Sequence, residues 1–176
     1  EALKGRIEAV ASFRGDVYVA ATRLYRSRGG KAPLVRVPEF PKRKVSSLLV
    51  VSDNQMFAGH VTGVWRFDGQ WRELWRGDKG VGRVTALARS EAGELFVGTT
   101  KGVAMLDAQG KLLSFDRVDS QVEALAVAHG SVWVGTRKHG LWSKRLSSSD
   151  SWTAINSYWG LPGVYVNDIS FDSAGN

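Results

Sequence analysis

The chain has 176 residues, of which 43% are hydrophobic and 23% charged, a composition typical of a globular protein rather than a disordered one. Its 24 Lys and Arg against 17 Asp and Glu give a net charge of +7, which we interpret as ordinary solubility charge, so no nucleic-acid partner is expected. The lack of cysteine excludes disulfides and thiolate metal sites, and no apolar run is long enough to predict a membrane segment.

An internal repeat of about 40 residues organises the chain. Four similar stretches begin at Ile7, Val45, Val84 and Val122, and a fifth begins at Val166. This spacing is typical of β-propeller blades, each of which is a four-stranded sheet. We therefore predict an all-β propeller segment forming a single domain over 1–176. Its blades are expected at about 7–44, 45–83, 84–121 and 122–165, with the first strand of a fifth blade in 166–176.

The third repeat shows the predicted strands most clearly. Alternating residues predict an inner strand, a continuous apolar run predicts a strand covered on both faces, and two further short apolar runs complete the sheet. In chain order these segments are 84–89, 95–97, 103–106 and 112–115. Turn residues interrupt every repeat after five to seven residues, which argues against helices.

Most of the seven tryptophans recur at fixed positions of the repeat. A residue that recurs once per blade is best explained by packing between blades. This interpretation covers Trp65, Trp71, Trp133, Trp142 and Trp152. Trp75 and Trp159 fall outside the pattern, and Trp159 lies in a link between two blades.

The last residues stop where another strand should follow, and the first residue is not Met. We therefore expect an incomplete arc of a larger propeller with about seven blades. The remainder of the same propeller, or a second copy of the chain, would be its partner.

The later repeats resemble the two-component regulator propeller repeat. The resemblance is carried by Gly160-Leu161-Pro162, by Val166-Asn167-Asp168-Ile169 and by Asp172 to Asn176, together with Val132-Trp133-Val134-Gly135-Thr136 and Gly140-Leu141 of the preceding repeat. It covers essentially residues 45–176, and the first repeat is the weakest copy.

This resemblance implies a role in sensing. Such repeats commonly form extracytoplasmic input domains of bacterial hybrid histidine kinases, often double seven-bladed propellers that respond to breakdown products of complex carbohydrates. They imply a periplasmic or other extracytoplasmic location and signal transduction by ligand binding. The chain itself contains no kinase, receiver or helix-turn-helix segment.

Motifs of catalysis are missing from the sequence. It has no nucleophile elbow, phosphate-binding loop, zinc-protease motif or calcium loop, and Gly77 to Gly82 has the wrong glycine spacing for a dinucleotide fingerprint. We therefore predict no enzyme activity, no cofactor and no metal. His60, His129 and His139 are the only candidates for a metal site, and solvated turn histidines are the simpler interpretation.

If a ligand binds, the hairpins after each second strand and the links between blades should gather at one end of the propeller. The candidate ligand-binding residues are His60, Lys101, Arg137, Lys138, His139, Tyr158 and Trp159. This basic end with an aromatic flank suits an acidic oligosaccharide or a protein, although solvated loop charges explain the cations equally simply. A protein-interaction scaffold is the main alternative, and a propeller lyase or hydrolase is a weaker one.

Overall fold

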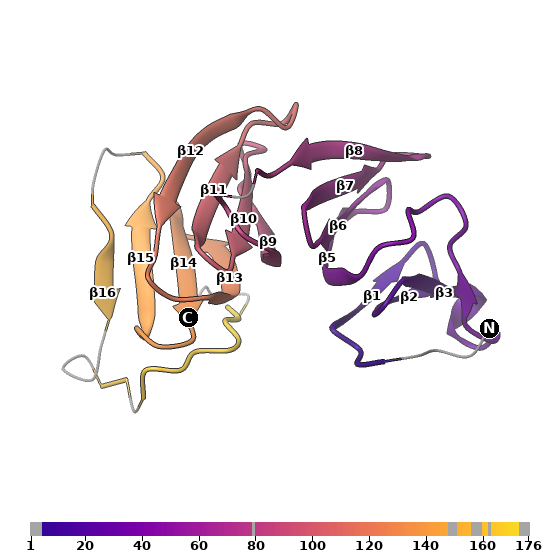
Figure 1. Ribbon diagram of the computed structural model, residues 1–176, viewed down its shortest axis with the longest axis horizontal. Coiled ribbons are helices and arrows are strands. Elements are labelled where there is room, and N and C mark those ends of the chain that lie inside the picture. Colours follow the sequence, from indigo (N-terminus) through magenta and orange to yellow (C-terminus); the bar gives the residue numbers. More distant parts are fainter. Residues whose placement is uncertain (1–4, 79, 148–150, 156–159, 162, 173–176) are drawn as a thin grey trace. The chain divides into compact units, whose positions relative to one another are not determined.

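The computed structural model describes residues 5–78, 80–147, 151–155, 160–161 and 163–172. These residues form sixteen strands and one 3₁₀ turn, η1 (Arg28–Gly30). The strands make four antiparallel four-stranded sheets, and in each sheet they lie side by side in chain order (Figure 1). The predicted all-β fold of four-stranded sheets is confirmed. The chain divides into two compact units, residues 1–78 and 79–176, each of which contains two of the sheets.

The first unit holds the sheets of the first two repeats. The strands of its first sheet are β1 (Ala9–Phe13), β2 (Asp16–Ala20), β3 (Leu24–Ser27) and β4 (Val35–Arg36). Those of its second sheet are β5 (Val45–Ser52), β6 (Gln55–His60), β7 (Gly63–Phe67) and β8 (Trp71–Arg76). Phe40 packs against Trp65 and Trp71 with ring centroids 5.6 Å and 5.0 Å apart, so both tryptophans belong to the core of this unit.

The second unit holds the sheets of the third and fourth repeats. The strands of its first sheet are β9 (Val84–Arg89), β10 (Leu95–Thr99), β11 (Gly102–Leu106) and β12 (Leu112–Arg117). Those of its second sheet are β13 (Val122–Ala128), β14 (Ser131–Thr136), β15 (Leu141–Arg145) and β16 (Thr153–Ile155). Every residue of β10 is buried, as its continuous apolar sequence predicts.

Glycines near the ends of β10 and β14 let the chain of the following repeat approach closely. A Cβ atom on Gly98 would lie 2.6 Å from Cγ1 of Val122, the first residue of the next repeat. A Cβ atom on Gly135 would lie 2.8 Å from Cγ1 of Val166, which begins the fifth repeat. The same repeat position therefore makes the same contact twice in the second unit, where the incoming valine occupies the space that a side chain would fill.

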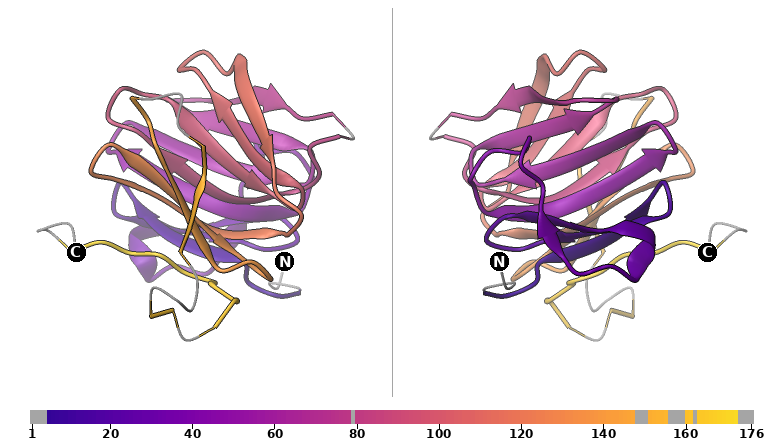
Figure 2. Two further views of the ribbon diagram at one scale, coloured as in Figure 1. Left: turned by 90° about the vertical axis from the view of Figure 1, so that its left-hand side faces the viewer. Right: turned by 90° about the vertical axis from the view of Figure 1, so that its right-hand side faces the viewer.

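The fifth repeat docks as expected but forms no strand in its described part. The Val166 amide donates to the Thr136 carbonyl oxygen (3.0 Å), as the Val45 amide donates to Ala21 (2.9 Å). Residues 163–172, which pass below the β13–β16 sheet in the left view of Figure 2, are nevertheless not a strand. The predicted first strand of a fifth blade is thus absent from 166–172, because no second strand among the described residues supplies a ladder of hydrogen bonds.

A threonine at the end of the second strand closes the hairpin in both sheets of the second unit. The Thr99 hydroxyl donates to the Gly102 carbonyl (2.9 Å) and accepts from the Lys101 amide (3.1 Å). The Thr136 hydroxyl donates to the Gly140 carbonyl (2.9 Å) and accepts from the His139 amide (3.0 Å). Both threonines are buried, and each hydroxyl makes one hydrogen bond as a donor and one as an acceptor.

His60 takes the place of this threonine in the second sheet. Only one of its two ring nitrogens finds a hydrogen-bond partner among the described residues. Its Nδ1 accepts from the Thr62 amide (3.2 Å), which leaves the hydrogen of the neutral ring on Nε2. This Nε2 is buried and has no partner among the residues that the structure describes. The side chain is fully buried, so the interpretation of His60 as a solvated turn histidine is wrong.

Burial also lowers the pKa of His60 to about 4, with the Arg43 guanidinium as the next largest cause. The Glu73 carboxylate opposes this shift, whereas Arg76 adds to it. Glu73 is itself held by Arg76, which donates to both of its carboxylate oxygens at 3.0 Å and 2.8 Å. His60 is therefore neutral at pH 7, and protonating it in the folded state is unfavourable.

Replacing Gly98 with alanine should destabilise the fold by about 1–3 kcal/mol, because the new methyl group overlaps Val122 in a packed core. Urea denaturation measures this free energy of unfolding. Gly163→Ala is the matched control, since nothing lies within 4 Å of a Cβ atom there. Equal effects of the two substitutions would contradict the packing argument.

The substitution His60→Thr should stabilise the protein by about 1–3 kcal/mol at pH 7.5, because it removes a buried donor without an acceptor and restores the hydroxyl of the other hairpins. Its advantage should grow by about 2 kcal/mol at pH 5. As the pH falls to 5, His60 of the unfolded chain binds a proton, whereas His60 of the folded protein, with a pKa of about 4, does not.

Urea denaturation at both pH values checks this prediction. His139→Gln, which removes an exposed histidine, is the control. A His60→Thr variant whose advantage over the wild type is the same at pH 7.5 and pH 5 would disprove the titration of His60.

Candidate functional site

Three loops of the second unit gather at one end of its sheets. They are the β10–β11 hairpin, the β14–β15 hairpin and the link from β12 to β13. The Val118 amide donates to the Lys101 carbonyl (3.1 Å), and the Arg137 amide donates to the Gln121 carbonyl (3.0 Å). The Lys138 amide donates to the Ser120 hydroxyl (3.0 Å). These bonds bring together four of the predicted site residues, namely Lys101, Arg137, Lys138 and His139.

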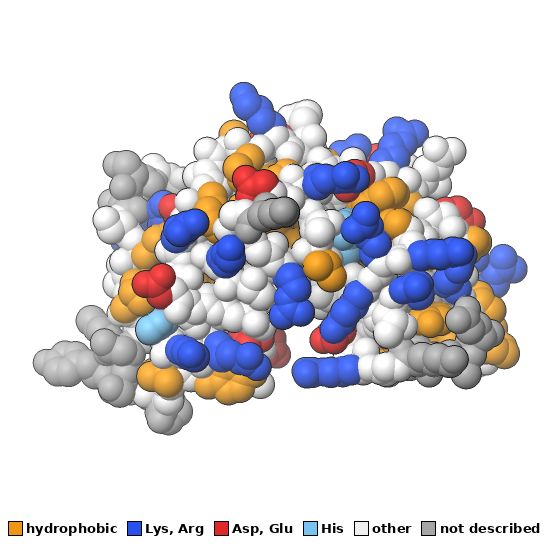
Figure 3. Space-filling model, viewed as in Figure 1, with side chains coloured by type: hydrophobic (Ala, Val, Ile, Leu, Met, Phe, Trp, Pro, Cys, Tyr) orange, Lys and Arg blue, Asp and Glu red, His pale blue; other side chains and the backbone are white. Residues whose placement is uncertain are grey.

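A pocket of about 510 Å³, here called the cationic pocket, lies between these loops. Four basic side chains line it beside a single acidic one, Asp119, and the basic residues are Lys101, Arg117, Arg137 and Lys138. Arg137 also forms an ion pair with Glu123 (3.1 Å), which neutralises part of its charge. Other Lys and Arg side chains are spread over the face shown in Figure 3, among acidic and uncharged ones.

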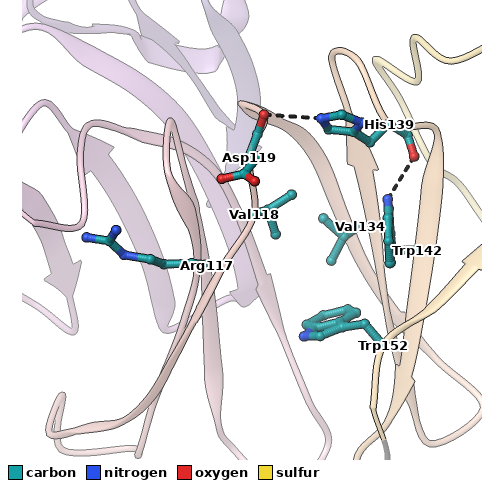
Figure 4. Close-up of a pocket in the computed structure, with 7 residues that line it drawn as sticks. All are labelled: Arg117, Val118, Asp119, Val134, His139, Trp142 and Trp152. Atoms are coloured by element: carbon teal, nitrogen blue, oxygen red, sulfur yellow. Dashed lines mark hydrogen bonds between the residues drawn. The ribbon is translucent and has the colours of Figure 1, made fainter.

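A second pocket of about 340 Å³, here called the aromatic pocket, adjoins the cationic pocket. Its lining comes from the β12–β13 link, from β14 and β15, and from the segment before β16, and comprises Arg117, Val118, Asp119, Val134, His139, Trp142 and Trp152. Figure 4 shows Val118 and Val134 facing each other, with both indole rings on the side of β15 and β16. Residues 117–119 line both pockets, so the two are joined along this link.

The two indoles of the aromatic pocket differ in their hydrogen bonding. Trp142 Nε1 donates to the His139 carbonyl oxygen (2.8 Å), which fixes the ring against the hairpin. Trp152 Nε1 is buried and finds no acceptor within the described part of the chain. Trp152 therefore offers the pocket an apolar ring, whereas its N–H is enclosed by the protein.

His139 contacts Asp119, but not as an acid–base pair. Its Nε2 lies 3.2 Å from the backbone carbonyl oxygen of Asp119, and the carboxylate points elsewhere (Figure 4). A carboxylate that orients a catalytic histidine would instead bond to the ring itself. No cluster of three or more potential metal ligands occurs among the described residues. The arrangement suits binding of a ligand by stacking, hydrogen bonds and charge.

The remaining predicted site residues do not join these pockets. His60 belongs to the first unit, is fully buried and is not among the residues that line either pocket. Tyr158 and Trp159 lie outside the described residues. Their roles in ligand binding, like those of Lys101, Arg137, Lys138 and His139, stay predictions.

Sequence reasoning missed Trp142, Trp152 and Arg117 as lining residues. The recurrence of the two tryptophans in the repeat assigned them to packing, and both do pack against the core of the second unit. One face of each ring nevertheless borders the aromatic pocket. The signal that could have found them is their position beside a predicted interblade link. Trp133, at another repeat position, packs instead against Phe171, with ring centroids 5.7 Å apart.

No family model matches the chain, and no curated protein matches it. The described residues also contain no helix long and apolar enough to cross a membrane. Similar solved structures do exist. The extracellular domain of a putative one-component system of B. thetaiotaomicron is 16% identical over 100% of this chain and 26% of that one, with a TM-score of 0.82.

Two further structures are similar. The extracellular domain of a putative hybrid two-component system of the same organism is 16% identical over 95% of this chain and 24% of its own length (TM-score 0.72). An ancestral GH74 enzyme is 15% identical over 85% of this chain and 25% of its own length (TM-score 0.65). The chain thus spans about a quarter of each of these proteins. The likeness shows that its fold is that of a β-propeller.

Proposed function

We propose that this chain is a ligand-binding segment of a β-propeller sensor domain in a bacterial signalling protein, that it acts outside the cytoplasm, and that its ligand is an oligosaccharide. The similar extracellular domains of one-component and two-component systems support the sensor role. The resemblance of the repeats to the two-component regulator propeller family points in the same direction.

The aromatic pocket is the observation that carries this proposal. Its volume of about 340 Å³ falls within the range of about 300–1,000 Å³ that is common for small-ligand sites. It presents two indole rings and two valines. A sugar ring has an apolar face that stacks on an aromatic side chain, so it matches this lining.

Binding without catalysis fits the geometry better than a lyase or hydrolase activity. The lining of the pocket contains a single carboxylate, Asp119, and it is the backbone carbonyl of this residue that contacts the His139 ring, so the described residues show no paired acid and base. A concave, largely apolar pocket also favours a small ligand over the broad, flat contact of a protein-interaction scaffold.

The substitution Trp152→Leu should weaken oligosaccharide binding about tenfold, because leucine keeps apolar bulk but removes the aromatic stacking face. Thermal-shift screening of the 176-residue chain against neutral and acidic oligosaccharides identifies the ligand. Titration calorimetry then gives its affinity for the wild type and the variant.

Trp133→Leu is the matched control. Trp133 lies in the same sheet and also has a buried Nε1 without a partner among the described residues, but it does not line the pocket. A panel that leaves the melting temperature unchanged would count against the sensor proposal and in favour of a protein-interaction scaffold.

A further inference from the structure

The cationic pocket gives the proposed site a second half with its own chemistry. Its positive charge comes from side chains on three separate loops, which the backbone bonds of Val118, Arg137 and Lys138 hold in place. The Lys138 amide donates to the buried Ser120 hydroxyl, so the base of this side chain is fixed beside the pocket. Its ammonium forms no ion pair with any residue that the structure describes. Among the described residues, Lys138 is therefore a cation without an ion-pair partner that neutralises its charge.

Arg137 has different surroundings in the same pocket. Its guanidinium forms an ion pair with the Glu123 carboxylate (3.1 Å), and its side chain is 57% exposed. A guanidinium has five N–H donors, and one carboxylate does not use all of them. Arg137 can therefore bind a further anionic group while Glu123 holds its orientation.

The two pockets are positioned to bind different parts of one molecule. Residues 117–119 line both, and His139, in the aromatic pocket, directly follows Arg137 and Lys138 of the cationic pocket. The apolar lining and the positive charges are thus next to each other on the same two loops. A ligand that fits both halves has an apolar face and a negative charge.

We propose that the aromatic and cationic pockets form one composite site for an acidic oligosaccharide. One sugar ring lies against Trp152 in the aromatic pocket, and a carboxylate or sulfate of the adjacent sugar is bound in the cationic pocket by Lys138, Arg137 and Lys101. This inference rests on the proposed function and adds the class of its ligand. Ammonium and guanidinium groups form charge-assisted hydrogen bonds to both kinds of anion, which is the chemistry that the two share.

Charge alone would also attract nucleic acid, but the lining favours a sugar. Single-stranded nucleic acid is bound by a groove that follows the phosphates and by rings on which successive bases stack. Here the cations line one pocket, and the indoles stand beside two valines in the other. The two pockets therefore suit a ligand that has one anionic group next to one apolar face.

Titration calorimetry of the whole chain with a galacturonate tetrasaccharide and with its methyl ester tests the inference. The two probes have the same rings, but the ester lacks the negative charge. The acid should bind about tenfold more tightly at low salt, and this advantage should shrink as the ionic strength rises. A sulfated galactan tetrasaccharide, compared with its unsulfated form, distinguishes sulfate from carboxylate as the preferred group. A preference for either charged form supports the proposal.

The variant Lys138→Gln should weaken binding of the charged probe about threefold to fivefold and leave binding of the neutral one unchanged. Lys111→Gln removes the same charge from an exposed turn residue that does not line the cationic pocket, and it should have no effect. Trp152→Leu should instead weaken both probes equally. Thermal denaturation of each variant confirms that it is folded before binding is compared.

Several outcomes would overturn the inference. Equal affinity for the charged and neutral probes would overturn the inference and leave the proposed function intact. Failure to bind either probe would contradict the inference and the proposed function alike. An equal loss in Lys111→Gln and Lys138→Gln would assign the preference to net charge rather than to the pocket. Binding of a single-stranded oligothymidylate as tightly as the galacturonate tetrasaccharide would replace the sugar with nucleic acid.

Discussion

The contact between the end of the second strand of one repeat and the first valine of the next underlies the rest of this structure. A four-stranded sheet cannot bury its apolar faces alone, so each blade depends on its neighbour. Gly98 lets Val122 approach within the second unit, and Gly135 does the same for Val166. A side chain at either of these two positions would overlap the incoming valine in the packed core of the second unit. Val166 makes this contact although residues 166–172 form no strand, so the contact does not require a four-stranded partner sheet.

The residue at the end of the second strand contributes both to the packed core and to the hydrogen bonds that close the hairpin. Thr99 and Thr136 close their hairpins with two hydrogen bonds each, in positions that exclude water. His60 occupies the equivalent place and leaves its Nε2 without a partner among the described residues, and burial, followed by the charge of Arg43, lowers its pKa so that the ring stays neutral. The same backbone frame therefore accepts a much larger side chain, at a cost in stability that the two threonine hairpins avoid.

The proposed site follows from the same frame. Because consecutive blades are joined by a link that crosses from the outer strand of one to the inner strand of the next, residues 117–121 run beside the 136–140 hairpin. Backbone bonds fix both segments, so their side chains project into two pockets with a common wall. The site needs no dedicated element of its own. It uses loops that the repeat already brings together, which is how rigid scaffolds commonly present binding residues.

The sequence by itself determined the repeat, the all-β fold and the order of the strands, because the alternation of apolar residues and turn residues is local. It also predicted that the loops bearing Lys101, Arg137, Lys138 and His139 meet, since a fixed repeat places equivalent hairpins at the same end. Only the tertiary structure decided that His60 is buried, that residues 166–172 form no strand, and that Trp142 and Trp152 border a pocket while also packing in the core. These outcomes depend on what surrounds each side chain in space. Burial and pocket formation arise from neighbours distant in the sequence, and a repeat position alone does not specify them.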